Sequence, residues 1–151
     1  MTTFTTRETI RDRLKALYDA TNDFEAVYSG IPKWSDMAGQ SPVLTVISDG
    51  TQTTFQGLNK NPREHFFVLT TWVLYSIESD SWTYAQAEDL LDTLEASVLQ
   101  VIRDNAAGST VGDLIEPTAG ASQIDRIVIE QNYRYITESR RIRVYLATGV
   151  V

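Results

Sequence analysis

The sequence predicts an α+β domain with a mainly antiparallel sheet and two helices packed on one face of it. Two stretches, 6–20 and 84–104, have the apolar period of amphipathic helices, and several others alternate as strands do. The order is helix, strand, hairpin, long strand, helix, loop and hairpin, as in an α+β domain. A length of 151 residues is typical of one domain, so we take 1–151 as a single domain.

The composition is that of an ordinary globular chain, with 42% apolar and 22% charged residues. Cysteine is absent from the sequence, which excludes disulfides, thiolate metal sites and cysteine nucleophiles. The N-terminal residues lack a signal-peptide core and no run of about 18 apolar residues occurs, so we expect a soluble protein that no visible signal exports. A pI near 4.6 argues against a dedicated nucleic-acid binder, because phosphate affinity needs a cationic surface.

The first helix, 6–20, begins where Thr5 and Glu8 have the spacing of a capping box. Its predicted buried stripe consists of Ile10, Leu14 and Leu17. Three basic residues recur every four positions on another face: Arg7, Arg11 and Lys15. Such a row is usually a solvated helix face, and it is also the first candidate for a basic contact surface.

The region between the helices predicts strands. A short extended segment covers 24–28, and 33–42 is predicted as a loop because glycine, serine and proline break any period. The stretch 43–57 predicts a β-hairpin, since Asp49-Gly50 suits a type I′ turn between two strand-like runs. The second run is polar enough to be an edge strand.

The stretch 66–77 predicts a strand that is apolar on both faces. Phe67 and Val73 lie on one face, and Phe66 and Trp72 on the other. A strand of this kind is covered on both faces. Since two helices cover one face, either long loops of the same chain or a neighbouring copy must cover the other; a neighbouring copy is the more specific interpretation.

The second helix, 84–104, begins with a capping box at Thr83 and Gln86. Its predicted buried stripe consists of Ala87, Leu91, Leu94, Val98 and Val101. Three carboxylates share another face: Glu88, Asp92 and Glu95. Carboxylates in this arrangement can bind a hard cation or act as an acid–base pair, but on a regular helix they are usually solvated.

The segment 105–122 is rich in small and polar residues and predicts a long loop, a kind of segment that is usually functional or mobile. Leu114 and Ile115 are its apolar exception. We expect the loop to be mobile in a free subunit, with these two side chains buried only when they dock into a groove on another chain.

The stretch 126–149 predicts a second hairpin, interrupted at 137–140. Its inward positions are Ile127, Ile129, Tyr133, Tyr135, Ile142, Val144 and Leu146. The arginines then form the outer face of the sheet: Arg126, Arg134, Arg141 and Arg143. A solvated ribbon that protects a sheet edge explains them without a ligand.

Charge is segregated along the chain. The segment 78–125 contains ten acidic residues and one arginine, whereas 126–143 contains five arginines and two glutamates. Complementary patches on one chain suit a head-to-tail contact between identical copies. We therefore expect the acidic helix face to lie opposite a basic surface, made either by the first helix or by the hairpin arginines.

The sequence lacks a constellation for catalysis. His65 is the one histidine, and without cysteine partners it is a poor metal ligand. The sequence contains no Gly-rich phosphate loop, GxSxG elbow or HExxH motif. We predict no catalytic residue, no metal, no cofactor, no enzymatic activity and no sequence-specific DNA binding.

Taken together, these features resemble a tail terminator, or tail-completion protein, of long-tailed double-stranded DNA bacteriophages, of the lambdoid kind. The resemblance covers the whole chain in order and length, and rests on "VYSGIP", "SPVLTVISDGTQTTFQG", "HFFVLTTWVLYSI", "AEDLLDTLEASVLQVI" and "DRIVIEQNYRYIT". The residues after Thr137, "ESRRIRVYLATGVV", predict a further strand that the family pattern does not require.

The resemblance implies a structural virion protein that is made in the cytoplasm of the host bacterium. Its subunits would form a ring, typically a hexamer, that caps the tail tube at the head-proximal end. The ring would contact the tail tube protein and a head–tail connector protein, and DNA would pass through its lumen without specific binding. The family has no catalytic residues to transfer to this chain.

Two other classes stay open. A cystatin-like α+β domain that binds or hydrolyses a small ligand needs polar and titratable residues converging inside a concave sheet, and the inward positions here are almost entirely apolar. An acidic, monomeric inhibitor of a basic protein would carry the same charge without assembling. Mass measurement in solution, with imaging for rings, separates these classes.

Overall fold

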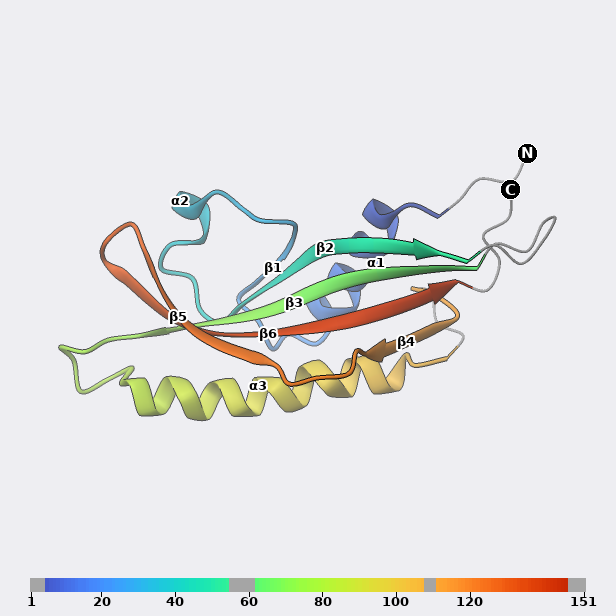
Figure 1. The fold of residues 1–151 in the computed structure, drawn as a ribbon. Coiled ribbons are helices and arrows are strands. Elements are labelled where there is room, and N and C mark those ends of the chain that lie inside the picture. The colour runs from blue at the N-terminus through green and yellow to red at the C-terminus, as the bar shows by residue number, and fades with distance from the viewer. Residues whose placement is uncertain (1–4, 55–61, 108–110, 147–151) are drawn as a thin grey trace.

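A computed structural model describes residues 5–54, 62–107 and 111–146 and confirms the α+β class. Its strands are β1 (Ala26–Ser29), β2 (Val43–Thr53), β3 (Arg63–Tyr75), β4 (Leu114–Pro117), β5 (Gln123–Ile129) and β6 (Tyr133–Leu146). Its helices are α1 (Arg7–Asp19), α2 (Trp34–Met37) and α3 (Tyr84–Asp104). They form one sheet in the order β1-β2-β3-β6-β4, with β5 also paired to β6. Only β1 and β2 run parallel among the described pairs (Figure 1).

Helix α1 confirms the first predicted helix, but its cap differs from the predicted one. Thr6 is the N-cap, and its hydroxyl accepts a hydrogen bond from the amide of Thr9 at 3.2 Å. The predicted capping box of Thr5 and Glu8 is therefore wrong by one position. The buried residues are Ile10, Leu14 and Tyr18. Leu17 is only partly buried and packs against the core that they help to form.

Helix α3 confirms the predicted range and the predicted capping box. The Thr83 hydroxyl accepts from the Gln86 amide at 3.3 Å, and the Gln86 side chain accepts from the Thr83 amide at 3.0 Å. The buried face agrees with the prediction except that Ile102 is buried in place of Val101.

Replacing Thr83 by alanine is expected to lower the free energy of unfolding by about 1 kcal/mol, because the first turn of α3 loses its side-chain acceptor. Thermal or urea unfolding of Thr83→Ala against wild type measures this loss. Thr93→Ala is the matched control, since Thr93 is exposed in the middle of the same helix. Equal effects of the two substitutions would show that the cap does not contribute.

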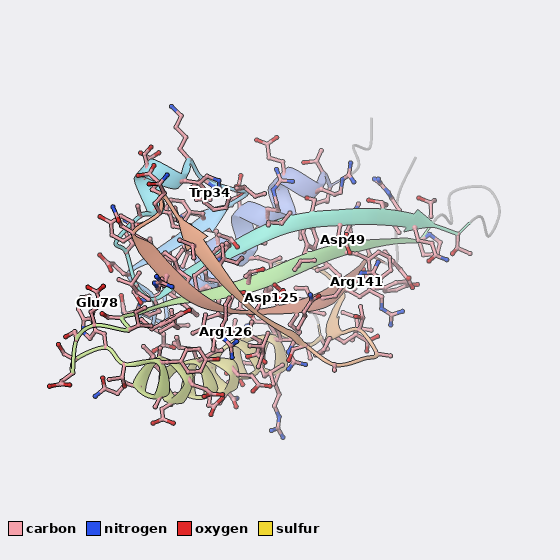
Figure 2. All side chains as sticks on the ribbon, turned by 60° about the vertical axis from the view of Figure 1, so that its left-hand side comes forward. Trp34, Asp49, Glu78, Asp125, Arg126 and Arg141 are labelled. Carbon is pink, nitrogen blue, oxygen red and sulfur yellow. The ribbon has the colours of Figure 1, made fainter. Side chains whose placement is uncertain are left out.

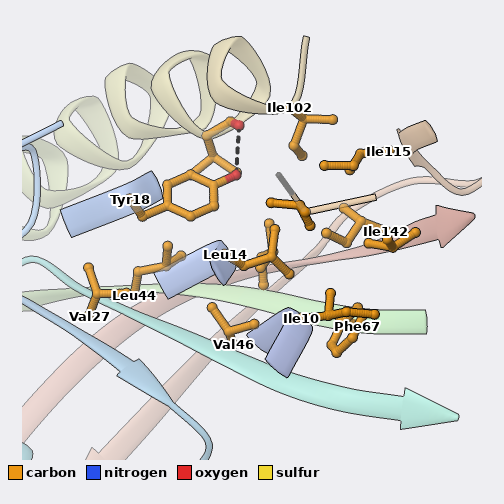
Figure 3. Close-up of a cluster of buried hydrophobic side chains, with 14 residues drawn as sticks. Ile10, Leu14, Tyr18, Val27, Leu44, Val46, Phe67, Ile102, Ile115 and Ile142 are labelled. Carbon is orange, nitrogen blue, oxygen red and sulfur yellow. Dashed lines mark hydrogen bonds between the residues drawn. The ribbon is translucent and has the colours of Figure 1, made fainter. Parts of the chain in front are cut away.

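Both long helices pack on one face of the sheet. Ile10 and Leu14 of α1 and Ile102 of α3 belong to one buried cluster with Phe67 and Ile142 of the sheet (Figure 3). The buried Tyr18 hydroxyl donates to the Val98 carbonyl at 3.0 Å and so joins α1 to α3. Burial raises the pKa of Tyr18 above its usual range, so this hydroxyl stays protonated and keeps donating.

The predicted hairpin turn at Asp49-Gly50 is wrong, and residues 55–57 of the predicted 43–57 hairpin lie outside the described residues. Strand β2 continues through Asp49 and Gly50 to Thr53, and its register with β3 shifts between Ser48 and Thr51. The dipeptide therefore forms a β-bulge, with Gly50 at φ 106°. A bulge and a tight turn both favour glycine at positive φ, which is why the dipeptide alone does not distinguish them.

The predicted interruption of the last hairpin at 137–140 is also wrong. Strand β6 runs through these residues and pairs with β3 from Arg134 to Leu146. The turn lies earlier, where Glu130 and Gln131 adopt positive φ values of 51° and 66°. Residues 138–146 therefore continue β6 and do not form a further strand, and residues 147–151 lie outside the described residues.

The uninterrupted β6 places its arginines on both faces of the sheet. Side chains alternate along a strand, so Arg141 and Arg143 share a face with Tyr135, and Arg140 shares the opposite face with Ile142. The prediction that the arginines form one outer face is therefore wrong.

The sheet face opposite α1 and α3 is covered, at one end, by the chain itself. Trp72 and Tyr135 form a second buried cluster with Met37 of α2, which lies in the predicted 33–42 loop. The Tyr135 hydroxyl donates to the Gln40 carbonyl at 2.8 Å and holds this segment on the sheet. The prediction of a two-sided strand is confirmed here, but the chain's own loop, not a neighbouring copy, provides the cover.

Strand β4 lies within the predicted 105–122 loop and pairs with β6. Ile115 is 1% exposed and joins the helix-side core, together with Val111. Gly112 permits the close approach, because a Cβ atom there would lie 2.6 Å from a Val144 methyl carbon. The prediction that Ile115 stays unburied in a free subunit is therefore wrong, whereas Leu114 is half-buried.

Candidate interaction surfaces

His65 is a buried core residue. Its side chain is 0% exposed, its Nδ1 atom lies 2.8 Å from the Thr51 hydroxyl, and its Nε2 atom has no hydrogen-bond partner. Burial, and then the charges of Arg63 and Arg7, lower the pKa of His65 to about 4. The imidazole is therefore neutral at neutral pH. In the described part of the chain, no three histidine or acidic side chains are placed to hold a metal ion together.

This buried histidine predicts a loss of stability in mild acid. The unfolded chain takes up a proton at His65 near pH 6.5, whereas the folded chain does so only near pH 4. Unfolding is therefore favoured as the pH falls through this window, by roughly 2–3 kcal/mol at its lower end. His65→Leu is expected to remove this pH-dependent loss. The free energy of unfolding of the variant should therefore rise relative to that of wild type as the pH falls. Urea unfolding at several pH values tests it; parallel pH profiles for the two proteins would contradict it.

The predicted basic row on α1 is only partly available for contacts. Arg7 is exposed. The Arg11 guanidinium donates to the Ser48 hydroxyl at 2.5 Å, and Lys15 forms an ion pair with Asp19 at 2.5 Å. Two of the three predicted residues thus have partners within the chain.

Two of the predicted hairpin arginines, Arg141 and Arg143, lie on the sheet face opposite α1 and α3. There they form ion pairs with residues of the neighbouring strands. Arg141 pairs with Asp49 at 2.8 Å and lies over the ring of Phe66, 4.0 Å from its centroid (Figure 2). Arg143 pairs with Glu64 at 3.1 Å and with Glu116. These contacts join β2, β3, β6 and β4, so the arginines are engaged within the subunit.

The arginines on the helix side lie close to the acidic helix. Arg140 pairs with Glu95 at 2.8 Å, and the Arg126 guanidinium lies 4.9 Å from the Tyr84 ring centroid. The prediction that acidic and basic surfaces lie on opposite sides of the subunit is therefore wrong at Glu95 and Arg126. Glu88 and Asp92 are exposed, and Arg134 lines a hollow beside the β5–β6 turn.

Three groups of exposed apolar side chains were missed by the sequence analysis; the third, on β5, consists of Ile124 and Val128, with exposures of 53% and 54%. The first contains Ile31 and Trp34, which are 64% and 44% exposed. We name these two residues, together with the exposed Lys33 between them in the sequence, the α2 surface. The second, which we name the β3–α3 surface, consists of Ile77, Trp82 and Leu90, with exposures of 65%, 64% and 39%. One feature of the sequence could have indicated these two surfaces. Trp34 and Trp82 both lie in segments with proline or serine, outside the stretches whose apolar residues are periodic.

The β3–α3 surface is held by an ordered loop. Trp82 has a positive φ of 61°, and its carbonyl accepts from the Ser76 amide at 2.7 Å. The Ser76 hydroxyl accepts from the amides of Glu78 and Ser79 at 3.3 Å each. Positive φ is uncommon for a bulky residue and often marks a functional position.

Two hollows adjoin Trp82. One, of about 530 Å³, lies between the β3–α3 loop and the β5–β6 turn, and includes Ile77 and Arg134 in its lining. The other, of about 430 Å³, includes Val73 and Leu90 in its lining. Trp82 thus stands between two concave, partly apolar regions, an arrangement that suits a protein contact.

Comparison with known proteins gives no match, either among protein-family models or among curated proteins. None of the helices in the described residues is long and apolar enough to cross a membrane.

Proposed function

We propose that this protein is a tail-terminator subunit of a long-tailed bacteriophage. Its copies form a ring, most simply a hexamer, that caps the tail tube at the head-proximal end and contacts the tube protein and a head–tail connector protein. The proposal rests on the resemblance of the whole chain to that family and on an architecture compatible with a small α+β subunit. In this function the protein is a structural component of the virion and not an enzyme.

The observation that favours an assembling protein is the exposure of large apolar side chains on more than one surface, two of which are the α2 surface and the β3–α3 surface. The α2 surface includes Trp34, and the β3–α3 surface lies partly in the loop that carries Glu78; both of these residues are labelled in Figure 2. Exposed apolar groups rimmed by charged residues are typical of protein contact sites. A subunit with two such surfaces has one for each neighbour in a ring.

The charge distribution suits a ring whose lumen carries DNA without binding it. The chain has a formal net charge of −7. Arg140, Arg141 and Arg143 pair with carboxylates of the same subunit, which reduces their attraction for phosphate. We therefore propose no sequence-specific DNA contact. A DNA complex that persists in an electrophoretic shift assay at elevated salt would contradict this part of the proposal.

Immunogold labelling tests the function directly. Particles produced by the strain that carries the gene are labelled with an antibody against this chain and imaged by electron microscopy. We expect one cluster of gold at the junction of head and tail. Deletion of the gene is expected to give separate heads and tails, with tail tubes of uncontrolled length because nothing caps them. Gold along the tube or at its distal end, or normal virions without the gene, would overturn the proposal.

A further inference from the structure

The α2 surface combines apolar side chains with charges of both signs, since Asp36 of α2 is exposed as well as Lys33. Ile31 and Trp34 are exposed, and Lys33 stands between them in the sequence and is also exposed. Trp34 is not a freely moving side chain, because its ring packs against Trp72 with centroids 5.8 Å apart. The surface is therefore an apolar projection whose charged neighbours are Lys33 and Asp36.

The β3–α3 surface combines apolar and acidic character. Glu78 and Asp80 lie in the same loop as Ile77 and Trp82, and both carboxylates are exposed. The hollow of about 430 Å³ beside Trp82 offers room for an isoleucine-sized side chain against Val73 and Leu90. This surface is thus concave and partly apolar, with Glu78 and Asp80 in its loop and Arg134 in the lining of the adjoining hollow.

We propose that the α2 surface of one copy docks on the β3–α3 surface of a second copy, in a head-to-tail contact. Ile31 and Trp34 supply the apolar projection, Trp82 and its hollow receive it, and Lys33 meets Glu78 and Asp80. This inference rests on the proposed ring, and it names the two surfaces that build it.

The direction of the contact follows from shape and charge. Two β3–α3 surfaces would bring the carboxylates of Glu78 and Asp80 together and leave two hollows facing each other, and two α2 surfaces would bring two projections together. Only the unlike pair is complementary, and a contact between unlike surfaces repeats from copy to copy until the chain of subunits closes. Within one subunit α2 packs on one face of the sheet and α3 on the other, and Gly39 and Ser41, which follow α2, also line the hollow of about 430 Å³ beside Trp82.

The contact replaces the one that the sequence analysis expected. Glu95 and Arg140, like Arg141 and Asp49, are already paired inside the subunit, so using them between copies would first require breaking these pairs. Lys33, Glu78 and Asp80 have no ion pair within 4.0 Å among the described residues. They are therefore better placed to select a neighbouring copy.

Two complementary variants test the proposal. The first carries Ile31→Ser and Lys33→Glu and leaves the β3–α3 surface intact. The second carries Trp82→Asn and Leu90→Gln and leaves the α2 surface intact; asparagine tolerates the left-handed backbone of position 82. Circular dichroism establishes that each variant is folded, and sedimentation velocity at millimolar concentration reports the oligomeric state. Ile124→Ser is the control, since Ile124 is 53% exposed on β5, outside both surfaces.

We expect wild type and Ile124→Ser to sediment alike as concentration-dependent multimers, and each contact variant alone to remain monomeric. An equimolar mixture of the two contact variants should give a one-to-one dimer and nothing larger, because it contains one intact pair of surfaces. Lys33→Glu combined with Glu78→Lys and Asp80→Lys in one chain should recover part of the assembly that Lys33→Glu loses.

The outcomes separate this inference from the proposed function. Multimers of unchanged size in either contact variant would overturn the inference and leave the ring function standing. Monomeric wild type, or a mixture that stays monomeric, would also overturn the inference, while gold at the head–tail junction would still support the function. Particles without gold at that junction, combined with the expected one-to-one dimer, would overturn the function and leave a head-to-tail self-contact.

Discussion

Replacing Trp72 by alanine is expected to lower the free energy of unfolding by about 3–5 kcal/mol, the range for removing a large aromatic side chain from a core. Trp72 is 6% exposed and lies at the centre of the cluster that joins α2 to the sheet. Its indole N–H donates to the Thr45 hydroxyl at 3.1 Å, and its ring meets that of Tyr135 edge-on at 5.9 Å. Alanine would remove all of these contacts and leave Thr45 without its partner.

Trp82→Asn is the matched control for this substitution, because it removes the same residue type from a position that is 64% exposed. Exposed substitutions usually change stability by no more than about 0.5 kcal/mol. Urea unfolding followed by far-UV circular dichroism compares the two variants, and loss of near-UV signal in Trp72→Ala would report the opened cluster. If both variants unfolded like wild type, the α2 segment would not be packed on the sheet in solution.

The helices could be predicted closely because their signals are local. In α3 the apolar period, the capping threonine and its partner glutamine all lie within the helix or next to it. These features depend on a few neighbouring residues and not on which strand lies opposite. The same locality explains the small errors, since Thr5 and Thr6 are chemically equivalent caps and only the backbone decides between them.

The strands could be predicted as elements but not as a topology. Asp49-Gly50 is compatible with either a turn or a bulge. It forms a bulge because the residues before it and the residues after it both pair with β3. In β6 the apolar residues change face between Tyr135 and Ile142. The structure explains this without a break in the strand: Tyr135 is buried on the α2 side, whereas its neighbour Ile136 is buried against α3, on the same face as Ile142.

The interaction surfaces were less predictable than the fold. Formal charge along the sequence gave no information on pairing, and Glu95 meets an arginine 45 residues away. Such pairs exist only once the sheet and α3 have formed. Conversely, Ile31, Ile77 and Trp82 look like candidates for burial in the sequence, and only the arrangement of the loops leaves them exposed.

Replacing Ile115 by alanine is expected to lower the free energy of unfolding by about 2–4 kcal/mol, because the residue is fully enclosed in the helix-side core. Leu114→Ala is the matched control in the same strand; Leu114 is half-buried on the opposite face and should cost no more than about 1 kcal/mol.

Hydrogen exchange on the monomeric protein separates an integral β4 from a segment that docks on another chain. The Ile115 amide donates to the Ala106 carbonyl at 3.0 Å, and β4 pairs with β6, so the amide should be protected without any partner. Equal, small losses for Ile115→Ala and Leu114→Ala, with rapid exchange at Ile115, would mean that β4 is not formed in the free subunit. Protection in the monomer, together with a large loss of unfolding free energy for Ile115→Ala alone, would place the strand within the subunit's own fold. A side chain that is buried only against another chain does not stabilise the free monomer.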